Sequence, residues 1–326
     1  MNTHTKYLGL DIESPIIAGS CGLTNDIEHL KQLEAAGAGA VIIKSVFEEQ
    51  IIFDIKRNLS MMAPTDNYGM SYEYVASHVA DDSLGKYFDL IREAKKQLHI
   101  PVIGSINCYS FENWMTYTQR FQEAGCDALE LNMAILPYET TLSYEDVDRL
   151  FSDIINTLKK SVSIPVSIKV SQNFTDMANF MQRLSWMGIN GITMFNKPLN
   201  VDIDVNTMQL HHAPSLSSPD ELYNTLRWVA ILCKKLRCDI SASTGVHTAD
   251  DVVKMLLAGA GTVQVVSCLY KNGVDYMRTL NDGLQAWMKS KGYDSVDQFR
   301  GMLAVKNNEQ ASMFFRTQFM KHFAEL

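Results

Sequence analysis

Two lysines and two asparagines, Lys44, Asn132, Lys169 and Asn196, each stand at or just past the carboxyl end of a short apolar run. Two lysines that face one cavity stabilise a developing anion, and asparagines hydrogen-bond amide or carboxylate edges without titrating. A single lysine in such a position more often extends into solvent. Because four polar side chains occupy equivalent positions, the pattern favours one shared site.

A second candidate site lies in residues 240–273, where small residues end two successive apolar runs. Ser243, Thr244 and Gly245 follow the first run, and Ser267 follows the second. Backbone N–H groups of such turns bind phosphate, and the loops after the last two strands of a (β/α)₈ barrel commonly do so. Ordinary strand-to-helix turns also use glycine, serine and threonine, so this segment alone leaves both readings open.

The elements that must position these residues alternate regularly along the chain. Apolar runs typical of buried strands occur at 15–18, 40–44, 101–106, 128–132, 165–170, 191–195, 239–243 and 262–266, and each is followed by a segment with helical periodicity. Residues 7–12 resemble half of a small hairpin that could close the barrel bottom. The pattern predicts one (β/α)₈ barrel over residues 1–326, with the carboxyl ends of its strands at one mouth.

Three segments are too long for simple connections between these elements, namely 45–80, 133–143 and 197–218. Loops of this length in compact domains are usually functional. We therefore expect long loops over the carboxyl-terminal mouth, with residues 45–80 as an irregular lid.

Composition restricts the class of partner and the compartment. The net charge is −8, and no stripe of Lys and Arg offsets it, which argues against nucleic acid and against an anionic membrane as partners. No apolar run reaches the roughly 20 residues of a membrane span, and residues 1–7 lack the apolar part of a signal peptide. The six cysteines show no CxxC spacing and the histidines no HExxH motif, so we expect reduced thiols, no metal and a cytoplasmic protein.

The same residues carry a resemblance to a known family. The chain resembles the soluble, class 1 dihydroorotate dehydrogenases over nearly its whole length. The matching segments are Ser14-Pro15-Ile-Ile-Ala18-Gly19-Ser20, Gly37-Ala-Gly-Ala-Val-Ile-Ile-Lys44-Ser45, Glu130-Leu131-Asn132, Ile168-Lys169-Val170, Asn196, Ala258-Gly-Ala-Gly-Thr-Val-Gln264-Val and the tail 284–301. The single motifs are weak, but their common order is specific.

The resemblance implies FMN as cofactor and a small cyclic substrate, dihydroorotate, which is oxidised to orotate in pyrimidine biosynthesis. Hydride would pass to flavin N5, with Lys169 beside the pyrimidine end of the flavin and Lys44 reaching both flavin and substrate. Lys44, Asn67, Asn132 and Asn196 would bind the substrate. The flavin would be lined by Ala18, Gly19, Ser20, Lys44, Ser45, Asn132, Lys169, Asn196, Ser243, Thr244, Gly245, Val266 and Ser267. A homodimer is also implied.

The chain departs from the family pattern at the catalytic base. After E-L-N the family continues x-S-C-P-N with a cysteine or serine base, whereas this chain has Met133-Ala134-Ile135-Leu136-Pro137. Isoleucine cannot accept a proton, and general-base catalysis is typically worth about 10²–10⁴-fold. Thr244 and Val266 also replace family glycines. These departures leave FMN binding as the expectation and place the turnover of dihydroorotate in question.

Several residues remain open as replacements for the base. Tyr138 and Glu139 lie in the same loop, Cys21 follows the first strand, and His211 and His212 lie in the long loop 197–218. A cysteine can be activated by a nearby lysine, and histidine suits proton transfer near neutral pH. A small buried filler for Cys21 and a solvated pair for the histidines are the commoner roles.

Three functions follow from these observations. The first is an FMN-dependent oxidoreductase of dihydroorotate dehydrogenase type acting on a CH–CH group. The second is a flavin-binding homologue with another substrate or without catalysis. The third is a barrel lyase in which Lys44 or Lys169 forms a Schiff base after desolvation.

Overall fold

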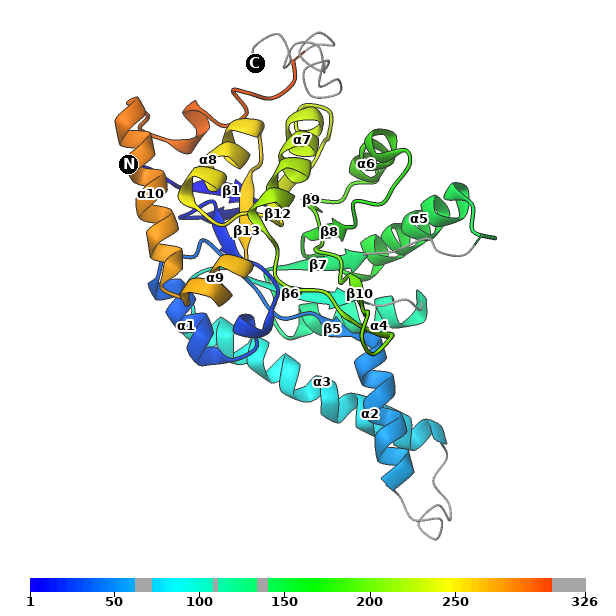
Figure 1. Ribbon diagram of the computed structural model, residues 1–326. Coiled ribbons are helices and arrows are strands. Elements are labelled where there is room, and N and C mark those ends of the chain that lie inside the picture. The colour runs from blue at the N-terminus through cyan, green and yellow to red at the C-terminus, as the bar shows by residue number, and fades with distance from the viewer. Residues whose placement is uncertain (62–71, 108–110, 134–139, 307–326) are drawn as a thin grey trace.

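Eight parallel strands form a closed barrel in the computed structural model, which describes residues 1–61, 72–107, 111–133 and 140–306 (Figure 1). The strands are β3 (Ile16–Ala18), β4 (Val41–Ile42), β6 (Val102–Asn107), β7 (Ala128–Met133), β8 (Val166–Val170), β9 (Gly191–Met194), β12 (Asp239–Ser243) and β13 (Thr262–Val265). They are ordered β4-β3-β13-β12-β9-β8-β7-β6, and pairing of β4 with β6 closes the ring. The predicted (β/α)₈ barrel is confirmed.

Helices surround this barrel, as Figure 1 shows. They are α1 (Ile27–Ala35), α3 (Tyr72–Gln97), α4 (Phe111–Glu123), α5 (Tyr144–Ser161), α6 (Met177–Trp186), α7 (Leu222–Leu232), α8 (Ala249–Ala258) and α10 (Tyr276–Lys291). Helix α5 illustrates why they form: Ser143 caps its first turn, and Phe151, Ile154 and Leu158 lie at helical spacing on its buried face. None of the described helices combines the length and apolar composition needed to cross a membrane.

A hairpin closes the amino-terminal end of the barrel, as residues 7–12 predicted. Strands β1 (Thr5–Tyr7) and β2 (Leu10–Ile12) pair antiparallel, and Tyr7, Leu8 and Ile12 are buried together with barrel side chains. The backbone N–H of Leu8 donates to Asp239 Oδ2 at 2.7 Å. The hairpin therefore supplies an apolar floor to the barrel and ties it to the start of β12.

Residues 45–80 are not the irregular lid that their length suggested. The described part contains a short strand β5 (Val46–Phe47), helix α2 (Glu48–Met61) and the first turns of α3, while 62–71 lie outside the described residues. Figure 1 shows α2 and the start of α3 side by side, projecting from the barrel. Residues 48–61 begin with two glutamates and are rich in helix-forming residues, a composition that favours a helix over a loop.

Residues 197–218 also contain regular structure that the expectation of a loop missed. Strands β10 (Val201–Asp204) and β11 (Gln209–His212) form an antiparallel hairpin. Its turn is held by Asp204 Oδ1, which accepts from the backbone N–H of Asn206 at 2.8 Å. Aspartate in this role is a known turn former, and the alternation Val-Asp-Ile-Asp is the pattern of a strand. The expectation of a loop was wrong because the alternation of apolar and polar residues favours strands even in a segment that is polar overall.

Candidate active site

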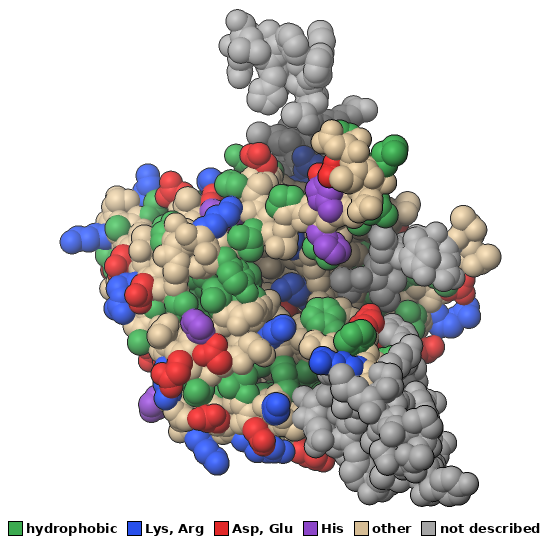
Figure 2. Space-filling model, turned by 60° about the horizontal axis from the view of Figure 1, so that its bottom comes forward, with side chains coloured by type: hydrophobic (Ala, Val, Ile, Leu, Met, Phe, Trp, Pro, Cys, Tyr) green, Lys and Arg blue, Asp and Glu red, His purple; other side chains and the backbone are tan. Residues whose placement is uncertain are grey.

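A cavity of about 640 Å³ opens at the carboxyl ends of the barrel strands. Its lining brings together eleven residues selected from the sequence, Ser20, Lys44, Ser45, Asn132, Lys169, Asn196, Ser243, Thr244, Gly245, Val266 and Ser267. The lysine-asparagine group and the serine-glycine group thus share one cavity. The face in Figure 2 is hollowed near its centre, with Lys and Arg side chains in and beside the hollow and mixed charges around it.

Two described residues of the expected flavin site, Ala18 and Gly19, are not among the residues that line the cavity. Ala18 is fully buried on β3, and Gly19 is also buried, with Val266 Cγ2 at 2.8 Å from the position of a Cβ. Gly19 is therefore needed for the close approach of two strand ends. Asn67 and Ile135 lie outside the described residues.

Lys44 is presented to the cavity by an irregularity in the sheet. Both β4 and β5 pair with β6, Ile42 opposite Ile103 and Val46 opposite Ile106. The three residues 43–45 therefore face only two, 104–105, which is a β-bulge, a feature that redirects side chains near active sites.

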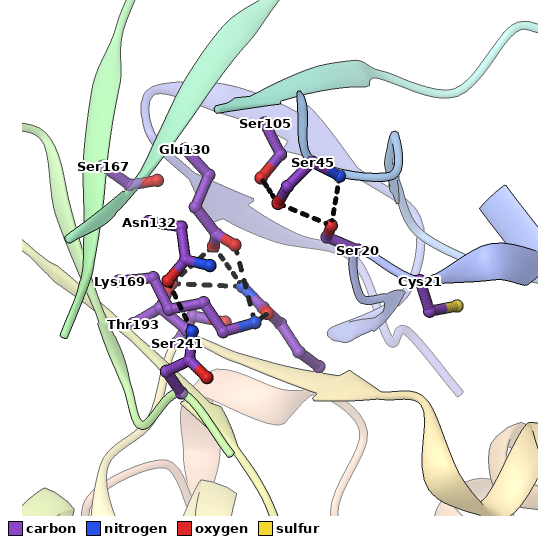
Figure 3. Close-up of polar contacts among 12 residues, drawn as sticks. Ser20, Cys21, Ser45, Ser105, Glu130, Asn132, Ser167, Lys169, Thr193 and Ser241 are labelled. Atoms are coloured by element: carbon purple, nitrogen blue, oxygen red, sulfur yellow. Dashed lines mark hydrogen bonds and ion pairs between the residues drawn. The ribbon is translucent and has the colours of Figure 1, made fainter. Parts of the chain in front are cut away.

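Three serine hydroxyls hold this bulge. Ser45 donates its backbone N–H to Ser20 Oγ at 2.9 Å, and its own Oγ lies 3.0 Å from Ser20 Oγ and 2.7 Å from Ser105 Oγ. Figure 3 shows these contacts as a continuous chain. Because Ser105 is fully buried on β6, the chain anchors the Lys44 segment to the barrel wall.

The floor of the cavity is a polar network around Lys169. The Lys169 ammonium donates to Gln264 Oε1 at 3.0 Å and lies 3.6 Å from Glu130 Oε1. Glu130 Oε2 accepts from Thr193 Oγ1 at 2.7 Å and from Gln264 Nε2 at 2.6 Å. All four side chains are buried. The Lys169 ammonium is thus desolvated at the cavity floor and has the Glu130 carboxylate as its counter-charge.

The two asparagines are locked to each other beside this network. Asn132 faces Lys169 in the β7–β8 register, and Asn196 Nδ2 donates to Asn132 Oδ1. Thr244 lies nearby in a left-handed conformation, with φ +80°, and its hydroxyl donates to the carbonyl of Phe195 at 2.9 Å. The hydrogen bond between the two asparagines restricts the orientation of both amides.

The opposite end of the cavity is a cluster of hydroxyl and backbone N–H groups. Ser217 donates its N–H to Ser267 Oγ at 2.9 Å and its hydroxyl to the same oxygen at 3.0 Å. Gly245 N–H points at Ser217 Oγ, 3.3 Å away. His247 Nε2 lies 3.3 Å from the same hydroxyl. Burial, and to a smaller extent the positive charge of Lys271, lowers the pKa of His247. Small polar groups of this kind bind an anion through several weak donors.

The residues left open as a base are not favoured by the described structure. Cys21 lines the cavity, but burial raises its pKa, which keeps the thiol protonated despite a smaller opposing effect of Lys169. His211 and His212 lie on exposed β11, and neither is among the residues that line the cavity. Tyr138 and Glu139 lie outside the described residues. Among the residues described, no three His, Cys, Asp or Glu side chains group to hold a metal ion.

Seven polar residues of the cavity wall were not among the predicted site residues, namely Asn107, Ser171, Asn173, Lys197, Ser215, Ser217 and Gln264. Gln264 lies within a matched motif, and its inward direction follows from β13, where it pairs with Ser243. Asn107 and Asn173 were detectable because both end or follow a predicted strand. Ser217 does not end a strand and comes from the long segment after β9.

Comparison with known proteins agrees with this geometry. Residues 65–288 match the family model described as dihydroorotate dehydrogenase. Among curated relatives, the catalytic subunit of dihydroorotate dehydrogenase B (NAD(+)) of Thermoplasma acidophilum is 28% identical over 302 residues, covering 91% of this chain and 97% of the relative. Dihydroorotate dehydrogenase A (fumarate) of Lactobacillus delbrueckii subsp. bulgaricus is 21% identical over 312 residues, covering 93% and 99%. The chain therefore belongs to the dihydroorotate dehydrogenase family, a family of oxidoreductases that act on a CH–CH group.

Proposed function

We propose that the chain is an FMN-dependent oxidoreductase that binds a small cyclic amide of the dihydroorotate type at the barrel mouth. The observation that carries the proposal is the polarity of the cavity, with a buried ammonium, Lys169, at one end and the Ser217–Gly245–Ser267 cluster at the other. A flavin mononucleotide has complementary ends, a pyrimidine edge that accepts charge and a phosphate. The cavity volume of about 640 Å³ lies within the usual range for such ligands.

The described residues fit this cofactor despite the replaced glycines. Thr244 turns its hydroxyl away to the carbonyl of Phe195, and Gly245 keeps the left-handed conformation, with φ +83°. We assign the phosphate to Gly245 N–H, Ser217 and Ser267, and the pyrimidine end to Lys169. FMN, when bound, supplies the acceptor for hydride. We further propose that residues 1–326 form one FMN-binding domain.

The lysines and asparagines of the cavity are assigned to binding the substrate and to stabilising its charge. Lys44, held out by the bulge, supplies a positive charge for a substrate carboxylate, a pairing that charge-assisted hydrogen bonds favour. Asn132 and Asn196 orient the amide edges, because their mutual hydrogen bond fixes both planes. Lys169 opposes negative charge that develops at the floor of the cavity. Asn67 keeps its proposed role in substrate binding, although it lies outside the described residues.

The proposed catalytic weakness is the missing base. Ile135 stands where the family has a proton acceptor, and the raised pKa of Cys21 does not make it a substitute. The alternatives are therefore a different substrate that needs no such base, or flavin binding without turnover. A Schiff base on Lys169 is less favoured, because an ammonium that lies 3.6 Å from Glu130 is not a free amine nucleophile.

An absorbance titration separates these functions. FMN is added to the apo-protein, and the complex is then titrated with dihydroorotate without oxygen. The proposal expects stoichiometric uptake of FMN and bleaching of the flavin band by dihydroorotate. FMN uptake without bleaching favours the altered or inactive homologue. A protein that takes up no FMN, or that is trapped as a substrate adduct by borohydride, contradicts the proposal.

We also propose a homodimer, with the hairpin β10–β11 in its interface. Because cross-strand partners share a face, Val201, Ile203 and Leu210 lie on one side of the hairpin, and they are 68%, 60% and 72% exposed. Exposed apolar area is unfavourable by about 25 cal/mol per Å², and an isolated two-stranded hairpin is marginally stable. Covering this face with the same face of a second copy removes both problems.

Sedimentation equilibrium tests the dimer. The wild-type chain is expected to sediment as a dimer at micromolar concentration, and Ile203→Asp as a monomer, because a buried unpaired carboxylate opposes association. Asp202→Asn, on the other face of the same hairpin, is the matched control and leaves the dimer intact. A monomeric wild type, or a dimeric Ile203→Asp variant, rules out this interface.

A further inference from the structure

Glu130 is a fully buried carboxylate whose two oxygens have different surroundings. Oε2 accepts two hydrogen bonds, from Thr193 and from Gln264. Oε1 has no hydrogen-bond partner among the described residues and lies 3.6 Å from the Lys169 ammonium. A buried charge without a partner is strongly disfavoured, so the lysine is the group that balances this oxygen. Figure 3 shows Glu130 and Lys169 together among the barrel strands.

Gln264 connects the two charges in a fixed sense. Its amide oxygen accepts from Lys169, and its amide nitrogen donates to Glu130. Reversing the amide would set two donors and two acceptors against each other, so the ion pair determines its orientation. The chain of contacts places Lys169 in one position at the cavity floor.

The groups below Glu130 do not compensate its charge. Tyr7 rises from the bottom hairpin, and its pKa is raised by burial and by the negative charge of Glu130, so its hydroxyl is neutral. Ser167, Thr193 and Ser241 around it are also neutral. The carboxylate therefore acts chiefly on Lys169 and, through it, on the ligand above.

We propose that Glu130 is a positioning residue that compensates the charge of Lys169 and so limits the preference of the cavity for an anionic ligand over a neutral one. The identification of that ligand as a flavin rests on the proposed function. A flavin cycle requires the same pocket to hold a neutral oxidised form and an anionic reduced form. An uncompensated ammonium would hold the anion far more tightly, whereas the lysine–glutamate pair presents a dipole with little net charge.

The flavin-bound arm of the test uses Glu130→Gln, which keeps the shape and removes the charge. The dissociation constant of oxidised FMN is measured by fluorescence, and the midpoint potential gives the ratio of reduced to oxidised binding. Removal of the nearby carboxylate is expected to raise this ratio about tenfold or more, with a smaller change in oxidised affinity. Glu34→Gln, a half-buried carboxylate that binds the His99 N–H at the other end of the barrel, is the matched control and leaves the ratio unchanged.

Thr193→Val separates charge from packing. It removes one hydrogen bond to Glu130 Oε2 and leaves the carboxylate in place. If Glu130 acts through its charge, the ratio of reduced to oxidised binding stays near the wild-type value in this variant. A shift as large as that of Glu130→Gln, or an unchanged ratio in Glu130→Gln itself, overturns the inference.

The apo-protein gives an arm that needs no flavin. Urea unfolding is compared for Glu130→Gln, Lys169→Met and the double variant. Because Lys169→Met strands a buried carboxylate, the double variant is expected to be more stable than Lys169→Met alone. Additive effects overturn the pairing. If wild type takes up no FMN, the proposed function fails, and this cycle still decides whether Glu130 and Lys169 act as a pair.

Discussion

A methyl group at Gly245 meets two obstacles, an unfavourable backbone conformation and a steric overlap with the start of α7. Gly292 shares only the first of them and so serves as the control. Gly245 has φ +83°, a conformation that is unfavourable for an alanine by about 1–2 kcal/mol. Its Cβ would also overlap the backbone nitrogen of Leu222 and lie 2.6 Å from Leu222 Cα. Gly292, at φ +73°, has the same backbone requirement but no neighbour within 4 Å of a Cβ.

The magnitudes for the two variants therefore differ. Gly292→Ala is expected to lower the free energy of unfolding by about 1–2 kcal/mol. Gly245→Ala adds the displacement of the start of α7, which overpacking data put at about 1–3 kcal/mol, for a total of about 2–5 kcal/mol. Urea unfolding of the apo-protein measures both values. FMN affinity is measured in parallel and is expected to fall in Gly245→Ala alone, because only Gly245 lies at the cavity.

Two results would refute this reasoning. Equal losses of stability in Gly245→Ala and Gly292→Ala would mean that the contact with Leu222 is not a constraint. Full FMN affinity in a destabilised Gly245→Ala variant would mean that the phosphate does not rest on this backbone.

Three further predictions concern titrating groups near the cavity. Burial alone would raise the pKa of Asp251, but hydrogen bonds from Lys254 and Thr248 lower it overall. Its capping of α8, worth about 1 kcal/mol, is therefore present at neutral pH and lost as the pH falls below about 3.9, where the stability of Asp251→Asn should converge with that of wild type. Burial and Lys271 lower the pKa of His247, so the unfolded chain takes up its proton first and wild type should lose stability relative to His247→Gln as pH falls below about 6.5. Since burial raises the pKa of Cys21, iodoacetamide should alkylate it more slowly than free cysteine at pH 7.5, and bound FMN should slow the reaction further; rapid, unprotected labelling in peptide mass spectra would contradict this.

Much of the barrel could be predicted because its signals are local. Apolar runs ended by polar residues identified the strands, and helical periodicity in the segments between them identified helices such as α5. The bulge at 43–45 could not be predicted, because it depends on the register with β6, about 60 residues away. The hairpin β10–β11 was missed for another reason, since its apolar face is exposed and its polar residues dominate the composition.

The candidate site shows the same division between local and long-range information. Lys44 and Lys169 could be selected from their positions at strand ends, which meet at one mouth in any parallel barrel. The contact of Glu130 with Gln264 joins residues 134 positions apart, and no spacing in the chain indicates it. The position of Lys169 could thus be predicted from the sequence, whereas its pairing with Glu130 depends on the closed barrel and could not.

The most direct test of the proposed site is a crystal structure of the chain grown with FMN. The account predicts phosphate oxygens within about 3 Å of Gly245 N and Ser267 Oγ, with the pyrimidine edge of the flavin beside Lys169. A flavin bound away from the mouth, or reversed so that its phosphate lies against Lys169, would contradict the account.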